Sequence, residues 1–106
     1  MPKYLISASY SAEGLRGLQK DKASGRRQAV TAAVEALGGK VESFYNALGA
    51  DDVYVIVDLP DNSTAAAIGV TVSATGLVRT RTTALLTVEE TDRALEKSVG
   101  YRPPGG

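Results

Sequence analysis

The chain has 106 residues, 43% of them hydrophobic and 23% charged, and its 12 basic and 12 acidic residues cancel to a formal net charge of zero. This balance is typical of one globular domain, residues 1–106, and it excludes an intrinsically disordered chain. The chain contains no cysteine and no histidine, which excludes disulfides and thiolate chemistry and removes the commonest zinc and haem ligands.

The first predicted elements are a strand and a long helix. Residues 3–10 alternate as a strand does, with one face formed by Tyr4, Ile6, Ala8 and Tyr10. Ser11 is a suitable N-cap for a helical stretch over residues 12–37, which we expect to break at residues 23–25, with Ser24 capping the second segment. That segment carries an apolar stripe at helical spacing, formed by Val30, Ala33, Val34 and Leu37.

Two further strands are predicted at residues 40–48 and 53–59, joined by a turn. The second of these is apolar on both faces. One face carries Val53, Val55, Val57 and Leu59, and the other carries Tyr54 and Ile56. A strand of this kind is typical of the centre of a sheet that is covered on both sides.

A second helix begins with Asp61 or Asn62 as its cap and continues to about Thr75. Residues 77–85 then form a fourth strand in which arginine and threonine alternate. Such polar alternation indicates an edge strand, because charge there discourages pairing with other chains.

The last predicted helix opens at a capping box, with Thr87 at the N-cap and Glu90 at the third helical position, and extends to about Val99. The tail, residues 101–106, contains two prolines and is not expected to form regular structure. The resulting order, βαββαβ with a short C-terminal helix, predicts an α+β, ferredoxin-like fold with both main helices on one face of an antiparallel sheet.

The other face of such a sheet is left open. Four strands of about seven residues cover roughly 450 Å². Because Tyr54 and Ile56, or the opposite set, must lie there, we expect a second copy of the chain to cover it, so that the protein is at least a dimer.

Several stretches of the sequence follow one another in a familiar order. They are Lys3-Tyr4-Leu5-Ile6, Ser9-Tyr10-Ser11-Ala12-Glu13-Gly14, Gly38-Gly39, Phe44-Tyr45, Gly49-Ala50-Asp51-Asp52, Asp58-Leu59-Pro60-Asp61-Asn62, Arg79-Thr80-Arg81-Thr82-Thr83 and Tyr101-Arg102-Pro103-Pro104-Gly105. Together they resemble the GYD domain family over nearly the full chain. The Gly-x-Tyr-Asp signature of that family is altered here, because Gly49 and Asp52 are present but Asp51 replaces the tyrosine.

The resemblance implies a dimeric α+β barrel, in which two sheets pack face to face. The open sheet face, the tyrosines and the arginine pair favour a small-molecule-binding or sensing domain with a pocket between the sheets. Two alternatives remain open: a small cofactor-independent enzyme of the monooxygenase or isomerase kind on the same barrel, and a purely structural assembly subunit.

Five side chains are candidate ligand contacts: Tyr10, Tyr45, Tyr54, Arg79 and Arg81. Tyrosine hydroxyls facing a pocket can orient a ligand, and two arginines on one strand can clamp a carboxylate or phosphate. Packing in the core or at an interface is the favoured explanation of the tyrosines, and edge-strand solubility or pairing with acidic residues of a partner subunit is the favoured explanation of the arginines.

Two pairs of adjacent charged residues have simpler interpretations. Asp51 and Asp52 could hold a cation or exchange protons, but a turn also favours aspartate, and neighbouring side chains point apart. Arg26 and Arg27 are predicted to lie on a solvated helix face.

Several partners are not expected. The zero net charge and the absence of basic residues from the third strand argue against nucleic acid. The sequence shows no metal or cofactor motif, so we expect neither. The N-terminal residues lack the apolar stretch of a signal peptide, and no apolar run approaches the roughly 20 residues of a membrane span, so we expect a cytoplasmic protein that does not bind membranes.

Overall fold

The computed structural model describes all residues from Met1 to Gly106. In chain order its elements are β1 (Lys3–Tyr10), α1 (Ala12–Ala36), β2 (Lys40–Asn46), β3 (Val53–Asp58), α2 (Asn62–Ala74), β4 (Val78–Leu85) and α3 (Val88–Leu95). The four strands form one antiparallel sheet in the order β2-β3-β1-β4. This arrangement is the expected α+β, ferredoxin-like fold, and the order also confirms that β3 is central and that β4 lies at an edge.

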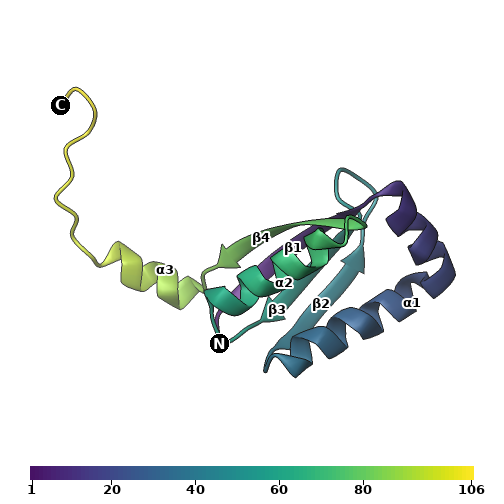
Figure 1. The fold of residues 1–106 in the computed structure, drawn as a ribbon. Helices are drawn as coiled ribbons and strands as arrows, with labels where there is room; N and C mark the ends of the chain where they lie inside the picture. The colour runs from purple at the N-terminus through teal and green to yellow at the C-terminus, as the bar shows by residue number, and fades with distance from the viewer.

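Two helices cover one face of the sheet (Figure 1). α1 packs over β2 and β1, whereas α2 packs over β4. The core lies between the sheet and these helices, and its nine buried members are Tyr4, Ile6, Ala8, Val34, Val53, Val55, Val57, Leu59 and Ala65. The alternation of β1 and β3 therefore places one side of each strand in the core and the other side on the open face.

Close backbone approach fixes the start of α1. Ser11 caps the helix, because its side chain accepts from the Gly14 amide at 3.1 Å, and its own amide donates to the carbonyl oxygen of Leu77 at 2.9 Å. A Cβ atom at Gly14 would lie only 2.1 Å from that same carbonyl oxygen. Glycine is required at this position because the helix meets the chain just before β4 at backbone distance.

The predicted break in α1 is present, but its position was wrong. The non-helical residue is Lys22, with φ 67° and ψ 166°, whereas Ser24 lies within the second segment and does not cap it. The first segment is attached to Leu77 at one end of the sheet, while the second runs along β2 (Figure 1). The bend is therefore placed by these two attachments rather than by the flexible Gly25.

The apolar stripe predicted for the second segment is only partly buried. Val34 is buried and Val30 is half-buried, but Ala33 and Leu37 are exposed. α1 ends at Ala36 with Leu37 as its C-cap, so the stripe stops one residue before its predicted end. Gly38 follows with φ 81°, a left-handed conformation that glycine adopts without strain.

β2 also departs from a regular strand. It ends at Asn46 rather than at residue 48, and its pairing with β3 shifts between Val41 and Ser43, which leaves Glu42 as a bulge. Such a bulge increases the local twist of an edge strand.

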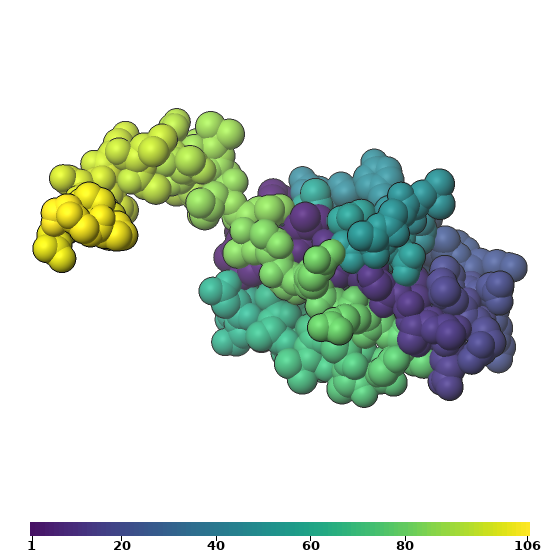
Figure 2. All heavy atoms as spheres, turned by 90° about the horizontal axis from the view of Figure 1, so that it is seen from above, coloured from purple at the N-terminus to yellow at the C-terminus, as the bar shows by residue number.

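The C-terminal region projects from the domain (Figures 1 and 2). The predicted capping box is confirmed, because Thr87 accepts from the Glu90 amide and the Glu90 carboxylate accepts from the Thr87 amide, both at 3.0 Å. α3 ends at Leu95, earlier than the predicted Val99, and every residue from 86 to 106 is exposed. No helix of the chain combines the length and apolar character needed to cross a bilayer.

Candidate functional site: a polar cluster on the open sheet face

The open face of the sheet carries the predicted arginines and two of the three predicted tyrosines. The register pairs Arg81 with Ser7, Arg79 with Ser9, and Tyr45 with Tyr54. Partners in an antiparallel ladder point to the same side, and these residues alternate with the core residues of their strands. Arg79, Arg81, Tyr45 and Tyr54 therefore share the face that the helices leave uncovered.

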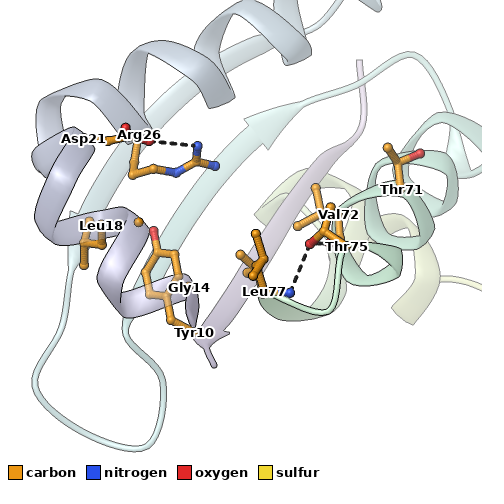
Figure 3. A pocket seen from close by; sticks show the side chains of 11 residues that line it. Tyr10, Gly14, Leu18, Asp21, Arg26, Thr71, Val72, Thr75 and Leu77 are labelled. Atoms are coloured by element: carbon orange, nitrogen blue, oxygen red, sulfur yellow. Dashed lines mark hydrogen bonds and ion pairs between the residues drawn. The ribbon is translucent and has the colours of Figure 1, made fainter. Parts of the chain in front are cut away.

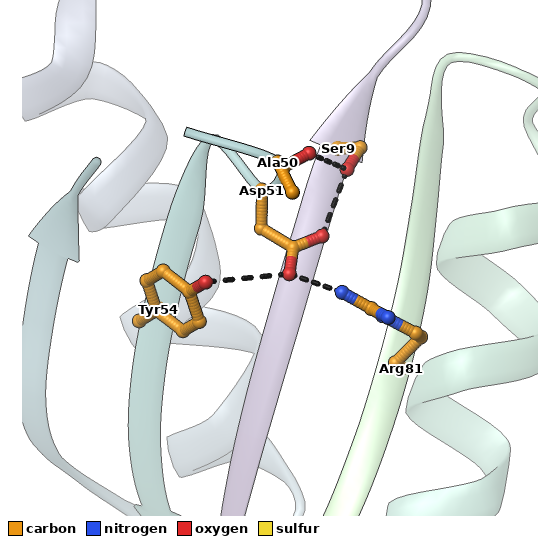
Figure 4. A network of polar contacts seen from close by, with 5 residues as sticks. All are labelled: Ser9, Ala50, Asp51, Tyr54 and Arg81. Atoms are coloured by element: carbon orange, nitrogen blue, oxygen red, sulfur yellow. Dashed lines mark hydrogen bonds and ion pairs between the residues drawn. The ribbon is translucent and has the colours of Figure 1, made fainter. Parts of the chain in front are cut away.

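A buried carboxylate connects three strands on this face (Figure 4). The Asp51 side chain is only 8% exposed, although it lies in the loop before β3. It accepts from the Ser9 hydroxyl at 3.0 Å and from the Tyr54 hydroxyl at 3.4 Å, and it forms an ion pair with the Arg81 guanidinium. Because the donors come from β1, β3 and β4, the loop is held against the sheet at one defined position.

The electrostatic balance favours the charged form of Asp51. Burial alone would raise the pKa of this carboxyl group, but hydrogen bonds from Ser9 and Arg81, together with the charge of Arg81, outweigh burial and hold the pKa below its ordinary value of 3.8. A carboxylate with this many donors is a weak proton acceptor. It is better suited to position Arg81 and Tyr54 than to act as a general base.

Tyr10 does not belong to this group. It lies at the end of β1 on the helix-covered side, where it contacts the core and Gly14. The sequence places Tyr10, Tyr45 and Tyr54 on neighbouring strands, but the odd–even alternation of β1 directs Tyr10 to the opposite side of the sheet from Tyr54. Tyr10 therefore does not share the open face with the other two tyrosines, and its position agrees with the alternative that it packs against the core.

The two aspartates of the altered signature turn make different contacts in the fold. Gly49 is exposed, with no atom near the position of a Cβ. The Asp52 carboxylate accepts from the Tyr10 amide at 2.9 Å, and the Asp52 amide donates to the Ala8 carbonyl at 2.8 Å. Asp52 therefore fastens the loop to β1, while Asp51 points onto the open face. As expected for neighbouring residues, the two carboxylates do not converge.

A shallow depression of about 380 Å³ lies beside the Asp51 carboxylate, lined by Ser9, Ala50, Asp51, Arg79 and Arg81. Arg79 forms no ion pair and is exposed, so its guanidinium keeps all of its donors available. Arg81 has 69% of its side chain exposed even though it pairs with Asp51. The depression is therefore bordered by two cations, only one of which is neutralised within the chain.

A second group of ion pairs lies at the opposite end of the open face. The Lys3 ammonium lies 2.8 Å from the Asp58 carboxylate and 3.4 Å from the Glu42 carboxylate. Hydrogen bonding to Asp58 raises the pKa of Lys3, even though desolvation acts in the opposite direction. Between the two ends lie Leu5 and Ile56, which are half-buried and face each other across β1 and β3. The open face is thus apolar in the middle and charged at both ends.

The arrangement defines the chain as a small α+β domain with a polar cluster around Asp51 at one end of an uncovered sheet face. No cluster of three or more acidic, histidine or cysteine side chains that could hold a metal ion is present. The family model that matches the chain is the GYD domain, over residues 4–95, and the chain therefore belongs to the GYD domain family. No curated protein and no solved structure matches it.

Sequence reasoning missed the residue at the centre of the site. Asp51 was interpreted as a turn residue and as a departure from the family signature, and Ser9 was not singled out. The available signal was the combination of an aspartate two residues before a buried strand with Tyr54 and Arg81 predicted on the same face. An acidic partner for the arginines was foreseen, but it was expected to come from another subunit.

Proposed function

We propose that this protein is a homodimeric domain that binds a small anionic molecule on the open sheet face, between two copies of the chain. The observation that carries the proposal is the buried Asp51 carboxylate, which fixes Arg81 beside the unpaired Arg79 at the edge of a shallow depression. Two adjacent guanidinium groups suit a carboxylate or phosphate, because arginine donors match those oxygens in pairs.

A second copy would complete the site. The depression is shallow in the single chain, and ligand sites usually enclose most of their ligand. The open face has an apolar middle and charged ends, so packing against an identical face would bury Leu5, Ile56 and Tyr54 while the ion pairs remain at the rim. This is the face-to-face arrangement of a dimeric α+β barrel.

Binding is favoured over catalysis by the state of Asp51. An enzyme without histidine or cysteine would need a carboxylate or tyrosine to move protons. The one buried carboxylate on the face has a lowered pKa and already accepts from three side chains, including the Tyr54 hydroxyl.

The dimer is tested by sedimentation velocity on the full chain and on Ile56→Lys, with Val70→Lys as the control. Val70 is exposed on α2, away from the open face. We expect the wild type and Val70→Lys to sediment as dimers and Ile56→Lys as a folded monomer. A wild type that is monomeric at high micromolar concentration would contradict a site formed between two copies of the chain.

The ligand class is tested by NMR titration with benzoate and with inorganic phosphate. We expect amide shifts around Ser9, Ala50 and Arg79, and binding about tenfold weaker in Arg79→Gln. Arg16→Gln, which removes an exposed arginine from α1, should bind as the wild type does. Equal binding by Arg79→Gln and the wild type would remove Arg79 from the site.

A further inference from the structure

A second hollow lies on the opposite side of the sheet, between α1 and α2. The two helices rest over different edges of the sheet, and the bend at Lys22 turns the first segment of α1 away from its second segment (Figure 1). Neither helix therefore fully covers the middle of the sheet. We call this hollow the interhelical groove and define it by Tyr10, Arg26, Val72 and Val78, which line both of its parts.

The inner part of the groove is almost wholly apolar. It has a volume of about 90 Å³, and its lining includes Phe44, Val30 and Ile68. The outer part, shown in Figure 3, is a wider mouth of about 280 Å³ with Leu18, Thr71 and Leu77 on its walls. An apolar cavity of about 150 Å³ is enough to hold benzene. The inner part, at about 90 Å³, is smaller than that, whereas the mouth, at about 280 Å³, can accept a molecule with one or two rings.

The mouth of the groove carries one positive and one negative side chain. The closest atoms of the Arg26 guanidinium and the Asp21 carboxylate are 3.8 Å apart, which is too long for a hydrogen bond (Figure 3). The Arg26 side chain is 31% exposed, so it lies against the groove rather than in solvent, and the prediction of a solvated face holds only for Arg27. The Tyr10 hydroxyl, on the same rim, forms no hydrogen bond with any other side chain.

The charges of Arg26 and Asp21 determine which polar group a ligand of the groove would carry at the mouth. An anionic head gains from Arg26 and is repelled by Asp21, and a cationic head has the reverse balance. A neutral head that both donates and accepts can hydrogen-bond to the two side chains at once. The wide spacing between their atoms leaves their hydrogen-bonding capacity available for such a group.

We propose that the interhelical groove is a binding site for an uncharged aromatic molecule that carries one hydroxyl or amide group. The ring lies in the mouth against Leu18, Val72 and Leu77, next to the apolar inner part, and the polar group lies between Arg26 and Asp21. This site differs from the one on the open face in position, because the sheet separates them, and in the charge of its ligand.

The test is an NMR titration of the full chain with three probes that share one ring system: 2-naphthol, 2-naphthoate and naphthalene. At neutral pH the first is uncharged, the second is an anion and the third lacks a polar group. We expect 2-naphthol to bind at least about tenfold more tightly than the other two and to shift the amides of Gly17, Leu18 and Leu77. Tighter binding of 2-naphthoate, or shifts confined to the open face, would overturn the proposal.

Two matched pairs of variants locate the site. Val72→Phe fills the groove and should weaken 2-naphthol binding by about tenfold or more, whereas Val70→Phe adds the same ring to the exposed side of α2 and should not. Arg26→Gln should weaken binding and Arg27→Gln should leave it unchanged. The Arg pair keeps the test valid if Val72→Phe unfolds the protein, and equal effects within both pairs would refute the site.

Discussion

The contact between Gly14 and Leu77 permits a sharp test of how α1 is attached. Ordinary carbon–oxygen contacts lie at about 3.3–3.6 Å. The Cβ atom of an alanine at position 14 would lie 2.1 Å from the Leu77 oxygen and 3.1 Å from the Leu77 carbonyl carbon. Since the neighbour is backbone, the start of α1 would have to move by about 1 Å, which would weaken the 2.9 Å hydrogen bond from the Ser11 amide.

The expected free-energy change follows from opposing terms. Overpacking destabilises by about 1–3 kcal/mol, and the weakened hydrogen bond adds about 0.5–1.5 kcal/mol. Alanine recovers at most about 1 kcal/mol through its higher helix propensity. Gly14→Ala should therefore lower the free energy of unfolding by about 0.5–3.5 kcal/mol.

Gly17 provides the matched control in the same helical segment. No atom lies within 4 Å of the position that a Cβ would occupy there, so Gly17→Ala should raise the free energy of unfolding by up to about 1 kcal/mol. Urea unfolding followed by circular dichroism should separate the two variants by about 1–2 M in midpoint. If Gly14→Ala is as stable as Gly17→Ala, the close attachment of α1 to Leu77 is incorrect.

Three further predictions concern the core, the polar cluster around Asp51 and the C-terminal residues 87–106. Leu59→Ala removes a side chain that is fully buried and should lower the free energy of unfolding by about 2–5 kcal/mol in the same urea experiment, and a loss below about 1 kcal/mol would contradict its burial. The pKa of Asp51 is lower in the folded state, so the stability it contributes is present above its unfolded pKa and is lost as the pH falls through the folded value. The difference in urea midpoint between the wild type and Asp51→Asn should therefore shrink as the pH drops below about 4, and a difference that does not change with pH would show that the charge is not involved. Deleting residues 87–106 should change the melting temperature by less than about 2 °C, because all of them are exposed, and calorimetry showing a larger drop would reveal contacts with the domain.

Most of the fold could be predicted from local patterns. The alternation in β1 and β3, the capping box of α3 and the polar character of β4 each depend on residues close together in sequence, and each was interpreted correctly. The bend at Lys22 could not be predicted in this way. Its position depends on where two distant parts of the sheet hold α1, and a lysine with positive φ has no local signal.

The candidate site was predicted in part. Arg79, Arg81, Tyr45 and Tyr54 share a face as strand periodicity requires, but Tyr10 lies on the other side. The position of Asp51 could not be predicted because it depends on the path of a loop. The residue becomes buried only when that loop folds over the ends of β1 and β3, so no pattern within the loop distinguishes it from an ordinary turn aspartate.

The two outer strands restrict how copies of this chain can meet. β2 has a bulge at Glu42, and β4 presents arginine and threonine along its length. A bulged or charged border is a poor template for adding another strand, which is the usual route to continuous intermolecular sheets and to fibrous aggregates. Association through backbone hydrogen bonding at either border is thus disfavoured, and concentrated solutions of the protein should resist amyloid-like assembly.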